Sequence, residues 1–372
     1  MIKKIIVSGV TGQDGSYMVE YLLKNTPHHI IGGVRRTSQL IKSNLNNFIN
    51  DARFKIASLD LTDVHSVTSL IADEKPDYFI NFGASTFVPD SWNQPAAVMQ
   101  VNTVSLIYIL EAIKKFVPNC RVYSAGSSEQ WGDVLGSPQN ESTPMRPRSV
   151  YGVSKCAASH ICKVYRESYG LYIVHGVLLN HESPRRQPGD MFVTRKITQG
   201  VARIARSISK IEPFLSIKLG NINSKRDWSY APDFIDGIWR MVNQEHYRLD
   251  TKFADNTNTR ELSKYIKEYI LASGETHSVR EFVELAFRLA KIEGYWVGEG
   301  INEKFIISNY LNDISELKSQ VLVEISPELF RPNEVDLLCG DSSMARKELG
   351  WIPQVSFEEL VRIMVEYDLK NL

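Results

Sequence analysis

The 372-residue chain lacks the features that mark a disulfide-stabilised or zinc-binding protein. It has four cysteines, Cys120, Cys156, Cys162 and Cys339, and no two of them stand in a C-x-x-C pair. This spacing disfavours both a zinc site and a disulfide framework. We therefore expect reduced thiols, no bound metal and a cytoplasmic protein.

Excess charge and long apolar runs are also missing. Lys and Arg together number 43, as do Asp and Glu, so no global field favours nucleic acid or an anionic membrane. The first residues pass directly into the strand-like Ile2–Val7, which is too short for a signal peptide. We expect no membrane helix, because no apolar run approaches the roughly 20 residues it needs. Local basic clusters must therefore bind any anion.

Glycines recur at a regular spacing after the first predicted strand, Ile5–Ser8. Gly9, Gly12 and Gly15 follow this strand directly and precede a helical pattern over Tyr17–Leu23. Such a turn lets the backbone approach a pyrophosphate, which then faces the free N–H groups of the helix. A plain helix-start turn is the alternative, but the strand before and the helix after favour a dinucleotide site. We assign to this loop Gly9, Thr11, Gly12, Gln13, Asp14 and Gly15.

The second predicted strand, Ile30–Val34, ends in Arg35 and Arg36 with no acidic residue. An acid at this position would bind a ribose 2′-hydroxyl, whereas arginine suits a 2′-phosphate. The pair therefore favours NADP over NAD, the alternative being a solvated basic loop. The ends of the next two strands supply further cofactor candidates, namely Asp60, Leu61, Phe82, Gly83 and Ala84.

Strands and helices alternate through the first half of the chain, and a long helix is expected over Val98–Phe116. This alternation predicts an α/β fold, a Rossmann-type doubly wound parallel sheet. A change to polar and basic composition after Asn180 suggests a smaller, mixed α/β C-terminal region that binds the substrate. We expect an NADP-binding domain over 1–180 and a mainly substrate-binding region over 181–372, with some segments returning to the first domain.

A set of reactive side chains lies between Arg121 and Lys155. Ser127 and Glu129 come just after a predicted strand, and Tyr151 and Lys155 lie four residues apart on one helical face. A nearby ammonium favours the phenolate, so Tyr151 can act as the base that removes a hydroxyl proton. Glu129 adds a group that can remove a proton next to a ketone. A loop or capping role for Glu129, and a surface role for the Tyr/Lys pair, are the alternatives.

The chain resembles an extended short-chain dehydrogenase/reductase and, more closely, the GDP-mannose 4,6-dehydratase family. The resemblance covers nearly the whole chain. It rests on the following stretches: Gly9–Ser16, Arg35–Arg36, Asp60–Asp63, Tyr165–Gly170, Asn180–Arg186, Phe192–Ile197, Arg226–Trp228 and Arg331–Val335.

The resemblance implies one reaction cycle at a bound GDP-sugar. The sugar C4 is oxidised with Tyr151 as base, supported by Lys155 and by the hydroxyl of Ser127. Glu129 takes the C5 proton, water leaves from C6, and the hydride returns from NADPH to C6. The resemblance adds Tyr151, Lys155, His181 and Arg186 to the cofactor site. It places in the sugar-nucleotide site Ser85, Thr86, Phe87, Ser128, Asn180, Val193, Lys196, Leu219, Gly220, Arg226, Arg331 and Glu334. The carboxylate of Glu334 suits the donor edge of guanine. The family also implies a homo-oligomer, a dimer or a tetramer.

Some positions depart from the family pattern. Ser127 stands where the family usually has threonine, and Ser85–Val88 and Ser229–Asp233 differ from the usual residues. The sugar therefore stays open between GDP-mannose and GDP-D-glycero-D-manno-heptose. A nucleotide-sugar 4-epimerase or 4-dehydrogenase would need Tyr151 and Lys155 but not Glu129. A silent NADP-sensing protein would be expected to lose these residues, and the chain keeps them.

Overall fold

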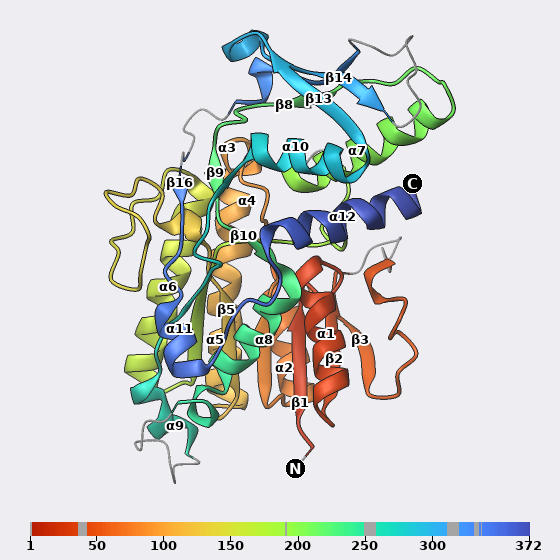
Figure 1. Ribbon diagram of the computed structural model, residues 1–372. Coiled ribbons are helices and arrows are strands. Elements are labelled where there is room, and N and C mark those ends of the chain that lie inside the picture. Colours follow the sequence, from red (N-terminus) through yellow and green to blue (C-terminus); the bar gives the residue numbers. More distant parts are fainter. Residues whose placement is uncertain are drawn as a thin grey trace.

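The computed structural model describes residues 2–35, 43–189, 192–248, 258–310, 320–330, 335 and 337–372. Figure 1 shows two parts, a larger body below and a smaller part above it. The larger part is built on one parallel sheet covered by helices on both faces. The smaller part combines a mixed sheet with three helices, α7 (Val193–Ser209), α10 (Val279–Leu289) and α12 (Phe357–Asn371).

The larger sheet has seven strands in the order β11-β6-β5-β4-β1-β2-β3, and every neighbouring pair is parallel. The strands are β1 (Lys4–Ser8), β2 (His29–Val34), β3 (Phe54–Ser58), β4 (Tyr78–Asn81), β5 (Arg121–Ala125), β6 (Ile173–Leu178) and β11 (Ile270–Leu271). The strand order reverses between β1 and β4, and ligands bind at such a switch point in open α/β sheets. The predicted doubly wound sheet is therefore confirmed.

Two apolar cores lie on the two faces of this sheet. One face packs against α1 (Gln13–Asn25) and α8 (Ala231–Val242), with Ile5, Val19 and Phe234 fully buried. The other packs against α2 (Val64–Glu74), α5 (Ser105–Phe116) and α6 (Val150–Tyr169). Because α8, β11 and α11 (Ser343–Leu349) come from the second half of the chain, the larger body draws on both halves.

The smaller part has its own core. Its sheet runs β13-β14-β15-β8, antiparallel except for the parallel pair of β15 and β8. These strands are β13 (Ile292–Val297), β14 (Lys304–Tyr310), β15 (Val321–Ile325) and β8 (Ile217–Leu219). Helix α10 begins with a capping box, in which Ser278 and Glu281 bond to each other's backbone N–H groups.

Two short sheets join the parts. In one, β7 (Asn180–Glu182) pairs in parallel with β10 (Trp228–Tyr230). In the other, β9 (Lys225–Arg226) lies between β12 (His277–Ser278) and β16 (Leu337–Leu338). The sequence predicts one strand over Tyr172–Asn180, and this expectation is wrong at its end. The chain leaves the large sheet after Leu178 and starts a new strand that carries polar side chains into the space between the two parts.

The long apolar helix begins earlier than expected. Its helical stretch is α4 (Pro95–Met99), a π-helical turn over Gln100–Val104, and α5. Within the described residues, Pro95–Phe116 is long and apolar enough to cross a membrane, which corrects the expectation that no run approaches that length. Half of its most apolar window is buried, and α5 packs against α2 and α6. It is a core helix of the larger body.

Candidate active site

A cavity of about 330 Å³ lies between the two parts, at the carboxyl ends of the large sheet's strands. Its walls bring together residues from both halves of the chain. The predicted residues that line it are Asp14, Phe82, Ala84, Thr86, Phe87, Ser127, Ser128, Glu129, Tyr151, Lys155, Asn180, His181, Arg186, Val193, Lys196, Leu219, Gly220 and Arg226. The cavity therefore contains the predicted catalytic set and much of both predicted binding sets.

The glycine loop forms a tight cradle at one end of this cleft. Gly9 has φ +66°, and a Cβ there would lie 2.9 Å from the backbone of Phe82 and Gly83. A Cβ on Gly15 would lie 2.4 Å from the carbonyl oxygen of Gly9. Helix α1 starts just after this turn, and no side chain caps its first N–H groups. Backbone donors with no side chain in the way suit the pyrophosphate of a dinucleotide.

Other loop residues are occupied by contacts within the protein. Gln13 donates to the carbonyl oxygen of His181 (3.0 Å) and accepts from the Ser183 hydroxyl (2.7 Å). The carbonyl of Thr11 accepts from Asn44 (3.1 Å). Gln13 therefore ties the glycine loop to β7, in addition to any contact with a ligand.

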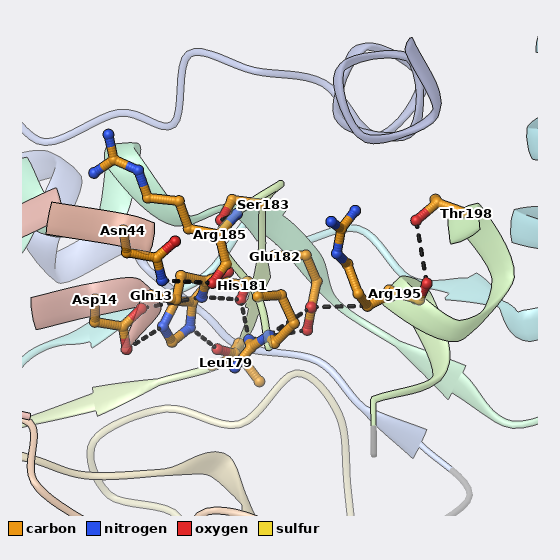
Figure 2. Close-up of polar contacts among 12 residues, drawn as sticks. Gln13, Asp14, Asn44, Leu179, His181, Glu182, Ser183, Arg185, Arg195 and Thr198 are labelled. Atoms are coloured by element: carbon orange, nitrogen blue, oxygen red, sulfur yellow. Dashed lines mark hydrogen bonds and ion pairs between the residues drawn. The ribbon is translucent and has the colours of Figure 1, made fainter. Parts of the chain in front are cut away.

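The partly exposed Asp14 and the buried His181 form a pair on the wall of the cleft (Figure 2). His181 Nδ1 lies 2.8 Å from the Leu179 carbonyl oxygen, and Nε2 lies 2.9 Å from Asp14 Oδ2. A carbonyl only accepts, and so does an ionised carboxylate, so both ring nitrogens carry hydrogen. Burial opposes ionisation of Asp14, but the charge and hydrogen bond of His181 outweigh it and lower the pKa of Asp14 to about 2. Burial would lower the pKa of His181, yet Asp14 raises it.

Tyr151 and Lys155 project from the first turns of α6, whose N-terminus is capped by the Ser149 side chain. Lys155 Nζ donates to the Ala125 carbonyl oxygen (2.8 Å) and lies 5.7 Å from the centre of the Tyr151 ring. Burial raises the pKa of Tyr151 to about 12, while a hydrogen bond with Ser127 acts in the opposite direction. Burial lowers the pKa of Lys155 to about 8. The phenol therefore needs a further positive charge nearby to become a base.

Ser127 and Glu129 flank the start of a short turn, Ser128–Gln130, that follows β5. The Ser127 hydroxyl oxygen accepts from the Glu129 backbone N–H (3.3 Å), which fixes the turn. Its partner Tyr151 comes from α6, so a serine hydroxyl, a phenol and a carboxylate converge on one cavity. The arrangement can exchange a proton with a sugar hydroxyl and a second proton with a neighbouring carbon.

Asn102 connects several elements of this region, and no sequence motif marks it. Its side chain bonds to the backbone N–H (2.8 Å) and carbonyl (3.1 Å) of Ser85 and to the Ser154 hydroxyl (3.0 Å). Asn102 belongs to the π-helical turn, and such turns are frequent at functional sites. It links the loop after β4 to the helix that carries Tyr151. Ser85 itself is not among the residues that line the cavity.

The remaining cofactor candidates surround the ends of β2, β3 and β4. Arg35 follows β2 and is exposed, and its charge contributes to the low pKa of Asp60, after the larger effect of two hydrogen bonds from Thr62. A Cβ on Gly83 would lie 2.3 Å from the buried Leu61 side chain, so this backbone is packed closely. Arg36, Arg331 and Glu334 lie outside the described residues, and their roles stay predictions.

The cavity wall also includes residues that the sequence analysis did not single out. Glu182, Phe192, Thr194, Lys218 and Trp228 line it. Phe192 meets Phe87 edge-on at 6.4 Å between ring centres. Glu182 and Thr194 lie within stretches that carry the family resemblance, which is the sequence signal for them, but neither residue stands out in the polar and basic composition after Asn180.

The parallel sheet, the glycine loop and the Ser/Tyr/Lys set define an extended short-chain dehydrogenase/reductase. Solved structures with this fold align over nearly the whole chain. They include dTDP-glucose 4,6-dehydratase from Bacillus anthracis in complex with NAD (TM-score 0.72, 17% identity, 99% of this chain and 97% of that one). RMD from Pseudomonas aeruginosa complexed with NADPH aligns with a TM-score of 0.71 at 19% identity, covering 100% of each chain.

Sequence comparison is more specific. The family model for GDP-mannose 4,6 dehydratase matches residues 6–364. The GDP-mannose 4,6-dehydratase of Vibrio cholerae serotype O1 is 36% identical, over 100% of this chain and 95% of its own length. The Drosophila melanogaster GDP-mannose 4,6 dehydratase is 38% identical, over 99% of this chain and 86% of its own length. The chain therefore belongs to the GDP-mannose 4,6-dehydratase family.

The Asp14–His181 pair predicts a bell-shaped dependence of stability on pH. We expect Asp14→Asn to lower the free energy of unfolding by about 1–3 kcal/mol near pH 6. The contribution of Asp14 to the free energy of unfolding is fully present above its ordinary pKa of 3.8 and is lost as the pH falls toward 2. The contribution of His181 is fully present below its ordinary pKa of 6.5 and is lost as the pH rises through its raised pKa. Urea unfolding of both proteins across this range measures the difference.

Asp133→Asn is the matched control, because its carboxylate is exposed and pairs only at the surface with Arg146. It should leave the pH profile of stability unchanged. A stability difference for Asp14→Asn that stays constant from pH 3 to pH 9 would show that the pair is not ionised.

Proposed function

We propose that this protein is an NADP-dependent GDP-mannose 4,6-dehydratase, which converts GDP-D-mannose to GDP-4-keto-6-deoxy-D-mannose. The observation that carries the proposal is the position of Glu129. Glu129 lines the same cavity as Ser127, Tyr151 and Lys155, and its charge acts on the Tyr151 phenol. Oxidation at C4 needs only the last three, whereas elimination of water also needs a base at C5. The family relationship supports this reaction over a simple oxidation.

The residues of the cleft suit a bound nicotinamide dinucleotide. The glycine cradle and the uncapped start of α1 suit its pyrophosphate. When bound, NADP⁺ supplies the hydride acceptor and the charge that favours the Tyr151 phenolate. Tyr151 then takes the proton of the C4 hydroxyl. Ser127 orients the same oxygen, and Lys155 holds positive charge beside the ring.

Glu129 acts on the ketone that this oxidation leaves at C4. The ketone acidifies the hydrogen on C5, and Glu129 removes it as a proton. The C6 hydroxyl leaves as water once it receives a proton, which the protonated Glu129 supplies. The C5–C6 double bond then accepts the hydride at C6 and, at C5, a proton that balances the one Tyr151 took from the C4 hydroxyl. Substrate and product therefore differ by one water, with no net oxidation of the sugar nucleotide by the enzyme.

The opposite wall of the cleft suits a sugar nucleotide. Lys196, Lys218 and Arg226 place positive charge around it, and Asn180 adds an amide. We assign the diphosphate to these cations and the guanine to Glu334, whose predicted role rests on the family resemblance. The aromatic pair Phe87 and Phe192 gives the cavity an apolar wall. GDP-D-glycero-D-manno-heptose, which needs more room, is the second candidate substrate.

We further propose a homo-oligomer that works in the cytoplasm. Helix α6 exposes Val153 and Val164, at 44% and 55%, next to the incompletely buried apolar helix α5. Such a surface suits a second copy of the chain. The cysteines are free, and Cys120, Cys162 and Cys339 are buried, which is compatible with a reducing compartment.

The reaction is tested by comparing Glu129→Gln with Tyr151→Phe. We expect the wild type to remove one water from GDP-mannose without accumulating NADPH. Glu129→Gln should lower dehydration by at least about 100-fold, because it keeps the shape but loses the base. Tyr151→Phe should abolish both oxidation and dehydration while NADP⁺ still binds. Mass spectrometry of the sugar nucleotide and absorbance of NADPH measure the two outcomes.

The same assay with GDP-D-glycero-D-manno-heptose identifies the preferred sugar from the ratio of kcat/KM values. Full turnover by Glu129→Gln would overturn the dehydratase proposal. Accumulation of NADPH by the wild type would instead indicate a dehydrogenase.

The choice of cofactor is tested at Arg35. We expect Arg35→Ala to weaken NADP⁺ binding by about 10-fold or more, because a charge-assisted bond to the 2′-phosphate is lost. Binding of NAD⁺, which lacks this phosphate, should change by less than about two-fold. Titration of each cofactor into the wild type and the variant measures the four dissociation constants. Equal losses for both cofactors would contradict the assignment.

A further inference from the structure

Glu182 is a buried carboxylate in the cleft that the proposed reaction does not use. It is 4% exposed and ends strand β7. Its Oε2 accepts from Arg186 Nε (2.8 Å) and from the Thr194 hydroxyl (2.8 Å), and its Oε1 accepts from Arg186 Nη2 (3.1 Å). Both oxygens are therefore engaged, so Glu182 is suited to hold its neighbours in place.

On one side, this carboxylate orients Arg186, which the family resemblance assigns to the cofactor site. The Arg186 guanidinium also donates to the His181 carbonyl oxygen and lies 4.5 Å above the ring of Phe192. A carboxylate, a carbonyl and an aromatic face thus orient its plane. A phosphate that attracts this guanidinium acts at the same time on Glu182.

On the other side, the same carboxylate holds the start of helix α7. Thr194 is the second residue of this helix and is 1% exposed. The helix has no side-chain cap at Phe192, so the bond from Thr194 to Glu182 ties its first turn to β7. Val193 and Lys196, from the same turn, line the part of the cleft assigned to the sugar nucleotide.

His181 and Glu182 are neighbours on strand β7, and their side chains point to opposite sides of it because successive side chains of a strand alternate. Figure 2 shows His181 directed toward Asp14 and Gln13, and Glu182 on the side of α7. One short strand therefore connects the glycine loop, the cofactor arginine and the substrate helix.

We infer that Glu182 is a positioning residue that couples cofactor binding to sugar-nucleotide binding. The inference rests on the proposed function, in which Lys196 of α7 binds the GDP-sugar, and on the family resemblance, which assigns Arg186 to the NADP site. A ligand that fixes Arg186 also fixes Glu182, and through Thr194 it orders the first turn of α7. The second ligand then meets a helix that is already held, so each ligand tightens the binding of the other.

Direct binding of NADP⁺ and of GDP, measured by calorimetry with no turnover, tests this coupling. We expect saturating NADP⁺ to tighten GDP binding to the wild type by about 5-fold or more. Thr194→Val should weaken GDP binding by about 5-fold and leave NADP⁺ binding within about two-fold, because it breaks only the α7 side. Glu182→Gln should weaken NADP⁺ binding by about 10-fold and should weaken GDP binding as well. In both variants the coupling should fall below about two-fold.

Thr198→Val is the matched control. Thr198 lies one turn further along α7, and its buried hydroxyl donates to Asp368 (2.7 Å), away from Glu182. This variant should lose thermal stability but keep the coupling. Thr194→Ser, which keeps the hydroxyl, should show the coupling that Thr194→Val loses. The inference is overturned if both ligands bind the wild type without coupling, if Thr194→Val retains the coupling, or if Thr198→Val loses it equally. If the wild type binds neither NADP⁺ nor GDP, the proposed function itself fails, and the inference with it.

Discussion

The departure of strand β7 from the large sheet is the constraint on which the cleft depends. After Leu178 the chain stops pairing with β11 and pairs with β10 instead, so three consecutive polar residues enter the space between the two parts. Asn180, His181 and Glu182 have no place in an apolar parallel sheet, because buried polar groups need partners. His181 and Glu182 find these partners on α1, on Arg186 and on α7. The two halves are therefore joined by polar contacts at the place where the ligands would lie.

This construction explains why charged side chains of the cleft are paired with one another. Asp14 faces His181, and Glu182 faces Arg186. A buried ion without a partner would cost several kcal/mol, whereas a paired ion keeps its position and its charge. Within the described residues, the side chains proposed for catalysis have no such pairing of opposite charges. Burial holds Tyr151 in its neutral form and lowers the pKa of Lys155, so the base is weak until a positive cofactor stands beside it. In the proposed function, the protein thus combines paired binding groups with a phenol whose activity as a base depends on the cofactor.

Much of the fold follows from the sequence because its signals are local. The glycine spacing predicts the β1–α1 turn, and the alternation of strands and helices predicts the parallel sheet. The approach of Ser127, Glu129, Tyr151 and Lys155 also follows, since parallel strands present their carboxyl ends at one edge. Other features depend on packing between distant segments. The π-helical turn that presents Asn102 leaves no mark in the apolar periodicity of its helix. The roles of Glu182 and Thr194 require the break after Leu178, whereas the sequence predicts one continuous strand over Tyr172–Asn180.

The central claim is that one hydride leaves C4 and returns to C6 within a single bound sugar. The most direct measurement uses GDP-mannose that carries deuterium at C4, incubated with the enzyme and unlabelled NADP⁺. The claim predicts that the 4-keto-6-deoxy product retains the deuterium, now at C6, and that no NADPH accumulates. Deuterium found in released NADPH, or a product without the label, would contradict it.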